Sequence, residues 1–377
     1  MGTKAEKTKV YNVIIMDRSG SMWDIQRPAI MGFNEVLGGV KAAKEKYAET
    51  QEQLITLVLF DSSSIDYVYW NADPSEAKIL TEETYVPGAS TPLYDAMGRT
   101  LTRLDKELAS ATNCSVVVTV ITDGLENASC EYSLAAVQSL IGHLKAKGWS
   151  FAYMGTDHDV QGVTVSLSIT NVIQFEKSEE ETIRTFNKER HAREAWGSKL
   201  DEYCRTHKGA TEEERIGFCK SMAEEYYKEP ELNPAYADRV TPARVTRLDP
   251  NEVFVFGSNR DGSHTGGAAA TAVRKFGAQV GVAEGPQGSS YAIPTTGQGV
   301  TADSIHAAFI RLLEYAIAHP EKTFLVTALG CGHAGYGEAY MASLLEEGIR
   351  VPNIHFPIGF WREYEMDGLI DNETIID

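Results

Sequence analysis

The chain has 377 residues, and its 53 acidic side chains outnumber 35 basic ones, which gives a net charge of −18 at pH 7. A hydrophobic fraction of 43% is sufficient for buried cores and argues against a wholly disordered chain, while the length indicates two or three domains. The acidic balance argues against a protein that wraps duplex nucleic acid, since a phosphate backbone needs clustered Lys and Arg; it is better suited to a cation as partner.

Apolar runs rich in Val and Ile alternate with helical patterns over residues 8–176. The predicted strands cover residues 11–16, 54–60, 115–121, 149–154 and 171–175, and the predicted helices cover residues 28–47, 92–109 and 132–147. Strands that alternate with helices predict an α/β fold with a doubly wound, mostly parallel sheet covered on both faces. Ligands of such sheets bind beyond the C-terminal ends of the strands.

The middle of the chain is richer in charged residues than the rest. Of the 68 residues in 176–243, 28 are charged, whereas charged residues make up 23% of the whole chain. Ser178 with Glu181, and Thr211 with Glu214, have the spacing of capping boxes, which predicts two helices. We interpret residues 177–243 as a charged, solvated helical connector between two compact domains.

Residues 244–365 show a second α/β pattern with glycine-dense loops. Strands are predicted at 252–256, 291–294, 324–328 and 353–357, and helices at 267–276, 303–318 and 338–347. This order predicts a three-layer α/β/α domain, followed by a C-terminal tail, residues 366–377. Residues 1–175, 176–243 and 244–377 carry net charges of −7, −4 and −7, so no part of the chain is basic.

The cysteines predict a reduced, cytoplasmic setting, since they are odd in number and form no C-x-x-C pair. They are Cys114, Cys130, Cys204, Cys219 and Cys331. The polar start and the short apolar runs predict neither a signal peptide nor a membrane span.

The first candidate site follows the first predicted strand, as Asp17-Arg18-Ser19-Gly20-Ser21. One carboxylate and two hydroxyls at alternate positions are hard oxygen ligands, which suit Mg²⁺. Two further oxygen donors, Thr91 and Asp123, lie in loops beyond other predicted strands. Each piece alone is also typical of an ordinary turn or helix cap, but the three together favour a metal site.

Residues 8–176 resemble a von Willebrand factor A (VWA) domain with a metal-ion-dependent adhesion site at Asp17, Ser19, Ser21, Thr91 and Asp123. The resemblance implies that these residues hold Mg²⁺, or another divalent cation such as Mn²⁺ or Ca²⁺, and that a carboxylate of a protein partner completes the metal shell. It implies binding, not catalysis. A nearby Asp157-His158-Asp159 cluster is interpreted as a helix cap and not as a second metal site.

The second candidate site consists of two glycine-rich loops, residues 257–268 and 330–337, each after a predicted strand. Glycines allow the backbone to approach a ligand, and the free amides at a helix start favour anions. Either loop alone is more often a tight turn; together they favour a diphosphate site. The first loop has neither a Walker lysine nor the G-x-G-x-x-G spacing.

Residues 244–365 resemble a macro domain or a macro-like relative, on the basis of Asn259, Gly266-Gly267-Ala268, Ile293-Pro294-Thr295 and the loop 330–337. Macro domains bind ADP-ribose, and some hydrolyse ADP-ribosyl adducts. The resemblance implies that Asn259 bonds the distal ribose. The residues expected to contact the nucleotide are Asn259, Gly266, Gly267, Ala268, Gly330, Gly332, Gly335 and Tyr336, with Tyr336 as a wall for a sugar.

Three features leave alternatives open in this second domain. Arg244-Val245-Thr246 stands where many macro domains carry the acidic residue that recognises adenine. The ligand is therefore either ADP-ribose or a related nucleotide. Phe360 and Trp361 either stack on a base or complete the core. Asp261 and His264 are candidate catalytic residues, for orienting a water and transferring a proton, or else a turn residue and a solvated loop side chain.

The leading hypothesis is a two-module intracellular protein, in which a Mg²⁺-dependent VWA domain binds a protein partner and a macro-like domain binds ADP-ribose or an ADP-ribosylated target. One alternative is a non-enzymatic scaffold or adaptor, in a phage-related or stress-response assembly, with a degenerate macro fold. Another is an ADP-ribosyl hydrolase that uses Asp261 and His264.

Overall fold

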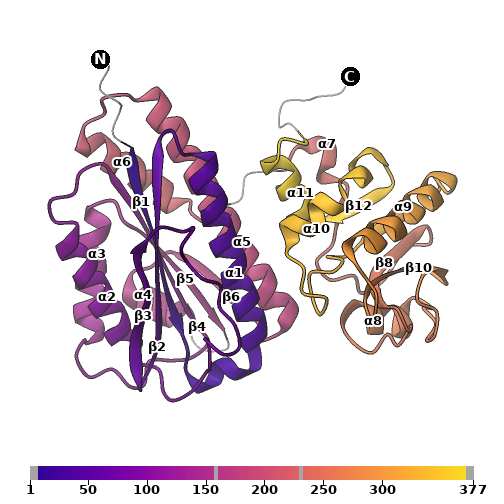
Figure 1. Cartoon of the computed structure of the whole chain (residues 1–377), viewed down its shortest axis with the longest axis horizontal. Helices are drawn as coiled ribbons and strands as arrows, with labels where there is room; N and C mark the ends of the chain where they lie inside the picture. The colour runs from indigo at the N-terminus through magenta and orange to yellow at the C-terminus, as the bar shows by residue number, and fades with distance from the viewer. Residues whose placement is uncertain (1–6, 157–159, 229–231, 371–377) are drawn as a thin grey trace. The chain divides into compact units, whose positions relative to one another are not determined.

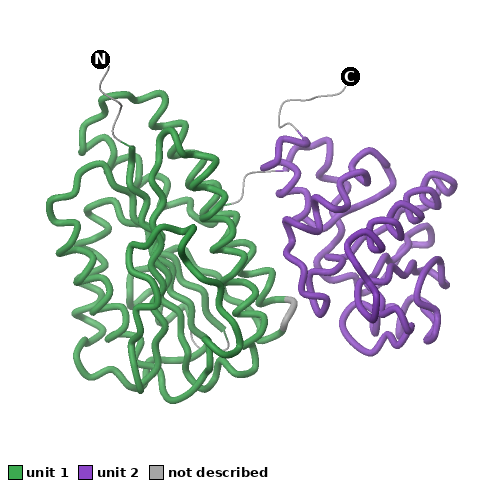
Figure 2. The backbone as a smooth tube through the Cα atoms, viewed as in Figure 1, with its two compact units in different colours: residues 1–229 green, residues 230–377 purple. Residues whose placement is uncertain are grey.

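Two six-stranded sheets organise the chain. Each belongs to one of the two structural units that Figure 2 shows in different colours. The computed structural model describes residues 7–156, 160–228 and 232–370, and the units span residues 1–229 and 230–377. The expected helix cap at Asp157–Asp159 lies outside the described residues. Helices flank both sheets, which are mostly parallel, so the α/β prediction is confirmed for both parts of the chain.

The sheet of the first unit has the strand order β3-β2-β1-β4-β5-β6. Its strands are β1 (Thr8–Asp17), β2 (Gln51–Asp61), β3 (Ser64–Ala72), β4 (Cys114–Thr122), β5 (Ser150–Thr156) and β6 (Asn171–Phe175). Only β3 is antiparallel to its neighbour, and β1 pairs with both β2 and β4 in parallel. Because Met16 lies opposite Ile121, β1 and β4 end side by side at the same edge of the sheet.

Helices cover both faces of this sheet (Figure 1). One face packs against α2 (Leu93–Glu107), α3 (Leu134–Ala146) and α4 (Val160–Leu167), and the other packs against α1 (Gln26–Lys46), α5 (Glu179–Thr206) and α6 (Glu212–Glu224). In β1, Val13 and Ile15 face α2, whereas Ile14 and Met16 face α1. Burial on both faces explains why this strand is continuously apolar.

All five strands and three helices predicted for the first unit are present, but β3 and α4 were not predicted. β3 is an edge strand with half-exposed, mixed side chains, so it lacks the apolar run of a buried strand. The turn before it is held by Asp61, whose Oδ1 accepts hydrogen bonds from the amides of Ser63 and Ser64 at 2.7 and 3.1 Å. The sequence feature that indicates the β2–β3 hairpin is therefore its turn and not the pattern of side chains along β3.

The charged helices α5 and α6 lie within the first unit. The composition of their segment favours a solvated connector instead. α5 buries Phe186, Trp196 and Leu200 against the sheet side that also carries α1. Two of its charged residues, Glu189 and Arg193, are also buried, with 1% and 7% of their surfaces exposed. Charge density indicates a solvated helix only when the charges have no partners in the fold, and here they do.

The partners come from the sheet and from the segment after α6. Glu189 Oε1 accepts hydrogen bonds from Thr119 Oγ1, Arg193 Nε and Tyr226 OH at 2.6, 2.6 and 3.0 Å. The Oε2 atom of Glu189 accepts another from Tyr227 OH at 2.6 Å. Arg193 also donates to Asn12 Oδ1 of β1 at 3.0 Å. A buried ion pair with its hydrogen bonds satisfied therefore joins α5 to the two central strands.

The sheet of the second unit has the order β7-β12-β11-β8-β10-β9, with only β9 antiparallel to its neighbour. The strands are β7 (Val240–Thr241), β8 (Glu252–Asn259), β9 (Gly285–Gln287), β10 (Ser290–Thr296), β11 (Thr323–Val326) and β12 (Ile354–Pro357). The helices are α7 (Pro234–Ala237), α8 (Gly267–Lys275), α9 (Ala302–Ala318), α10 (Glu338–Leu344) and α11 (Ile358–Met366). α8 packs on one face, and α9, α10 and α11 pack on the other.

The residues from 232 to 241 also belong to this unit, because β7 adds an edge strand to the sheet next to β12. Arg239 donates hydrogen bonds to the carbonyl oxygens of Ile349 and Val351, each at 2.9 Å. Trp361 in turn donates from its indole nitrogen to the carbonyl of Arg239, at 2.9 Å. Phe360 and Trp361 are fully buried, which supports the core alternative for these aromatics. No helix of the described residues is long and apolar enough to cross a membrane.

We expect Glu189→Ala to lower the free energy of unfolding by about 3 to 5 kcal/mol, because it leaves the buried guanidinium of Arg193 without its carboxylate. Urea denaturation followed by tryptophan fluorescence measures the change. Arg205→Ala, which removes an exposed cation from the same helix, is the matched control and should change stability little. Equal losses from the two substitutions would show that the buried network does not support the fold.

Candidate functional site

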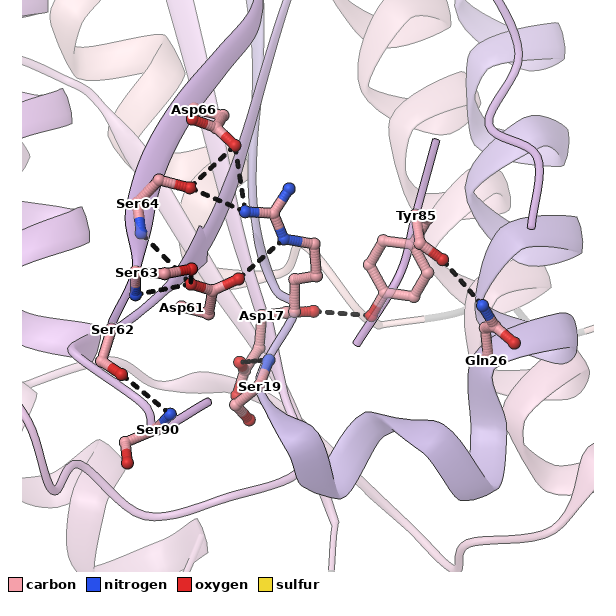
Figure 3. Close-up of polar contacts among 11 residues, drawn as sticks. Asp17, Ser19, Gln26, Asp61, Ser62, Ser63, Ser64, Asp66, Tyr85 and Ser90 are labelled. Atoms are coloured by element: carbon pink, nitrogen blue, oxygen red, sulfur yellow. Dashed lines mark hydrogen bonds and ion pairs between the residues drawn. The ribbon is translucent and has the colours of Figure 1, made fainter. Parts of the chain in front are cut away.

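The metal site predicted from sequence lies at the C-terminal edge of the first sheet, where β1 ends at Asp17 and β4 ends at Thr122. Asp17 Oδ1 accepts a hydrogen bond from the amide of Ser19 at 2.7 Å, and Oδ2 accepts one from Thr122 Oγ1 at 2.6 Å. The carbonyl oxygen of Asp17 accepts another from Tyr85 OH at 2.6 Å (Figure 3). These contacts fix the carboxylate and turn the chain sharply after β1.

The other four predicted ligands lie around Asp17 on three loops. Ser21 Oγ donates to Asp123 Oδ1 at 2.6 Å, and the hydroxyl oxygens of Ser19 and Ser21 are 3.2 Å apart. A Cβ atom at Gly124 would lie 3.4 Å from Ser21 Oγ and 3.5 Å from the hydroxyl oxygen of Thr91. The structure therefore brings all five predicted residues together at one edge of the sheet.

Arg18 fixes the first of these loops to the β2–β3 hairpin. Its guanidinium donates to Asp61 Oδ2 at 2.9 Å, to Ser64 Oγ at 2.8 Å and to Asp66 Oδ2 at 3.0 Å. Although burial raises the pKa of Asp61, hydrogen bonds from Ser63 and the hydrogen bond and positive charge of Arg18 hold it below its ordinary value. The side chain of Arg18 thus contacts the β2–β3 hairpin and not the site residues. These contacts fix the position of the segment that carries Asp17 and Ser19.

The loop that carries Asp123 is fixed to the start of α2. The amide of Thr91 donates to Asn127 Oδ1 at 2.8 Å, and the amide of Asn127 donates to the Thr91 carbonyl at 3.1 Å. Asp95 of α2 accepts hydrogen bonds from the amides of Cys130, Glu131 and Tyr132, at 2.8 to 2.9 Å. Thr91 and Asp123 are therefore held by two loops that brace each other.

The electrostatics of the site are those of two buried carboxylates that need a cation. Burial and, to a smaller extent, the negative charge of Asp123 raise the pKa of Asp17 to about 6, although hydrogen bonds from Thr122 and Ser19 oppose the shift. Both side chains are buried. Such a site stabilises the charged carboxylates only when a cation is bound close to them.

A residue that sequence reasoning missed supplies one such cation. The ammonium of Lys177 lies 2.9 Å from Asp123 Oδ2, an atom that accepts no hydrogen bond within the described part of the chain. Lys177 follows β6, whose C-terminal end lies at the same edge of the sheet as those of β1, β4 and β5. The topology indicates this edge, but nothing in the sequence distinguishes Lys177 from its charged neighbours.

The residues present fit a hard divalent cation. They offer the hydroxyls of Ser19, Ser21 and Thr91 together with the carboxylates of Asp17 and Asp123. The completely buried Asp123 Oδ2 accepts no hydrogen bond within the described residues and contacts the ammonium of Lys177, so it is a carboxylate oxygen that a metal ion could take over from that cation. An oxygen-only set of this kind suits Mg²⁺ or Mn²⁺ and leaves positions for water or for a ligand.

The site opens to solvent at Ser21, which is exposed, whereas the other four ligand residues are buried. Two large apolar side chains lie close to this opening in the chain: Trp23, two residues after Ser21, is 55% exposed, and Leu125, two residues after Asp123, is 51% exposed.

The second candidate site, in the second unit, lies beyond β8, β10 and β11, which are neighbours and parallel. Asn259 ends β8, and its Oδ1 accepts a hydrogen bond from the amide of Asp261 at 3.2 Å. A Cβ atom at Gly297, which has a φ of +114°, would come within 2.8 Å of that same oxygen. The close approach places Asn259 against the loop after β10.

The glycines of the two loops occupy different environments. Gly266 and Gly267 are exposed at the start of α8, and Ala268 follows half-buried in its first turn. Gly330 is buried, with a φ of +76°, whereas a Cβ at Gly332 would meet no atom within 4 Å. Gly335 is exposed, and the ring of Tyr336 stacks on Tyr340 with centroids 5.7 Å apart. The two loops follow neighbouring parallel strands and so share one edge of the sheet.

Asp261 and His264 occupy opposite environments. Asp261 is exposed, and the amide of Ser263 donates to its Oδ1 at 2.8 Å, which holds its pKa below the ordinary value. His264 is only 5% exposed and donates from Nε2 to the carbonyl of Val282 at 3.0 Å, with its ring edge-on to Phe256. Asp261 has the contacts of a turn residue, while His264 is packed inside the unit and is not a solvated loop side chain.

Comparison with known proteins finds distant structural likeness only. No known family profile matches the sequence, and no curated protein matches it. Among solved structures, the chain is similar to the vWF domain of the type V pili tip protein Mfa5 from Porphyromonas gingivalis, with 12% identity, a TM-score of 0.35, and coverage of 48% of this chain and 95% of that one.

It is also similar to manganese-loaded Plasmodium vivax TRAP protein, with 15% identity, a TM-score of 0.33, and coverage of 48% of this chain and 73% of that one. A third similar structure is the SpRpn10 VWA domain, with 8% identity, a TM-score of 0.33, and coverage of 47% and 94%. These likenesses concern about half of the chain, and no function follows from them.

We expect the stability of the metal-free protein to depend on the charge of Asp17. Its folded pKa of about 6 lies above the ordinary 3.8, so the favourable contribution is complete below pH 3.8 and is lost as the pH rises through about 6. The loss is at most about 3 kcal/mol. Urea denaturation in chelator between about pH 4 and 7 measures it, and Asp17→Asn should flatten the curve. Parallel curves for the two proteins would contradict the assignment.

Proposed function

We propose that the first unit is a VWA domain whose adhesion site binds a divalent cation and, through it, a carboxylate of a protein partner. The observation that carries the proposal is the meeting of five oxygen-bearing residues at one sheet edge, with the buried Asp123 Oδ2 accepting no hydrogen bond in the described structure. Asp17, Ser19, Ser21, Thr91 and Asp123 would hold the ion. When bound, the ion supplies the positive charge that attracts an anionic group of the partner.

The surroundings of the site support a protein as the partner. Both oxygens of Asp17 already accept hydrogen bonds, so this residue chiefly orders the loop and contributes charge, while the hydroxyls and Asp123 remain for the ion. Trp23 and Leu125, two positions after Ser21 and Asp123 in the sequence, are exposed apolar side chains. Exposed aromatic and aliphatic side chains next in sequence to the site residues suit a protein partner better than a free ion.

Isothermal titration of the full chain with MnCl₂ tests the metal half of the proposal. Ser21→Ala and Asp123→Asn each remove an oxygen donor or a charge from the site, and we expect each to weaken binding by about tenfold or more. Asp73→Asn removes an exposed carboxylate of the same unit and is the matched control. Unchanged affinity in both site variants would exclude this edge of the sheet as the metal site.

The partner half is tested by selecting random displayed peptides on the full chain in Mg²⁺ and eluting them with EDTA. The selected peptides should carry Asp or Glu beside an aliphatic or aromatic residue, and Trp23→Ala should reduce their binding while leaving the Mn²⁺ affinity unchanged. Enrichment without acidic residues, or elution that does not depend on the chelator, would count against a metal-bridged partner.

For the second unit we propose a macro-like function, the binding of ADP-ribose or a related nucleotide. It is supported by the common edge of β8 and β11, where two glycine loops and the exposed start of α8 offer backbone amides to an anion. Asn259 lies at the same edge, beside the loop after β10. The competing proposal is a scaffold whose second unit binds no nucleotide.

Gly332→Glu separates these two proposals for the second unit. A Cβ atom there would meet no atom within 4 Å, so the backbone leaves room for a substitution, and the negative charge of the glutamate repels a diphosphate. Calorimetry with ADP-ribose should show binding to the native chain, at least tenfold weaker in Gly332→Glu and in Asn259→Ala. Gly142→Glu, also at an open position but in α3, is the control. Absence of binding to the native chain would favour the scaffold.

A further inference from the structure

Lys177 is the cationic side chain that the structure places on a predicted metal ligand. Its Nζ lies 2.9 Å from Asp123 Oδ2, and its side chain is 21% exposed, whereas that of Asp123 is 0% exposed. The other oxygen of this carboxylate, Oδ1, accepts the hydroxyl of Ser21. The ammonium therefore faces the one oxygen of Asp123 that is left for an ion.

Asp123 needs a positive charge beside it, and in the absence of a metal ion another group must supply that charge. A fully buried carboxylate oxygen without a hydrogen bond is strongly destabilising unless a cation lies beside it. A second buried carboxylate, that of Asp17, is close enough for Asp123 to raise its pKa. In the structure Lys177 meets this need with a single positive charge, which balances one of the two carboxylates.

We propose that Lys177 is an internal cation that holds Asp123 in the metal-free protein and is displaced when a divalent cation binds. This inference rests on the proposed metal site. An ammonium 2.9 Å from a carboxylate oxygen and a metal ion on the same carboxylate repel each other at this short range, so the two occupy Asp123 in alternation. The long, partly exposed side chain of Lys177 has a route to solvent when it leaves.

The position of Lys177 in the chain gives this exchange a consequence. The residue lies two positions after the end of β6 and directly before Ser178, the N-cap of α5, whose hydroxyl accepts the amide of Glu181 at 3.2 Å. In the metal-free protein, the ion pair fastens this junction to the loop that carries Asp123. Metal binding releases that fastening, so the short segment between β6 and α5 loses its attachment to the Asp123 loop when the metal site is occupied.

Two measurements on the full chain test the exchange. In titrations with MnCl₂, Lys177→Met removes the competing charge and should bind the ion about tenfold more tightly. Lys44→Met, which breaks an exposed ion pair with Asp73 in the same unit, should leave the affinity unchanged. In thermal unfolding, Lys177→Met should lower Tm in chelator, because Asp123 loses its counter-charge, and should show a larger rise in Tm on adding Mn²⁺ than the native chain.

A third measurement reports directly on the amine of the native protein. Acetylation of Lys177 by an N-hydroxysuccinimide ester, quantified by mass spectrometry, should be faster with Mn²⁺ than in chelator, while acetylation of Lys44 stays constant. Weaker Mn²⁺ binding in Lys177→Met, or acetylation of Lys177 that ignores Mn²⁺, would overturn the exchange while leaving the metal site intact. A native chain that binds no Mn²⁺ would instead overturn the proposed function itself.

Discussion

The parallel register of β1 with β4 is the constraint on which the proposed metal site depends. It places the end of β1 beside the end of β4, so Thr122 can donate to one oxygen of Asp17 while the amide of Ser19 donates to the other. A shift of this register by one residue would turn Asp17 away from the site and bring an apolar neighbour in its place. The two apolar faces of β1 resist that shift, because each must remain buried against its own helices.

The first unit contains two buried carboxylate systems that contrast in a useful way. Glu189 accepts hydrogen bonds from four side chains, and its partner Arg193 belongs to the same helix, so the charge is fully satisfied within the fold. Asp123 accepts one hydroxyl and otherwise relies on Lys177, a flexible side chain from another loop. A satisfied pair of the first kind supports the fold, whereas an incompletely satisfied one of the second kind is suited to exchange one cation for another.

The sequence predicted the buried strands of both sheets and brought out the five residues proposed to hold a metal, which the structure places at one sheet edge, because each carries its signal locally. Parallel strands buried on both faces are apolar throughout, and Asp17, Ser19 and Ser21 directly follow one. The segment 177–243 could not be assigned in this way. Its charges suggest solvent, and the polar residues that pair with them, such as Thr119 and Asn12, lie far away in sequence within strands that otherwise look apolar.

The same limit explains the other differences. Lys177 is one charged residue among many until the end of β6 brings it to Asp123. His264 lies in a glycine-rich loop that looks solvated, yet it is buried by a contact with Val282, eighteen positions later in the chain. Each of these roles depends on a tertiary partner that the local sequence does not indicate, and buried polar residues are where such partners decide the outcome.

The net charge of −18 therefore has different meanings in different parts of the fold. At the edge of the first sheet, carboxylates are buried together, so their mutual repulsion favours any cation that can reach them, whether an ammonium or a metal ion. At the edge of the second sheet, the groups offered are backbone amides, whose partial positive charges act over a few ångströms and are not counted in the net charge. An acidic protein can thus carry one site for cations and another for anions, since what each site binds is decided by the groups within reach of the ligand.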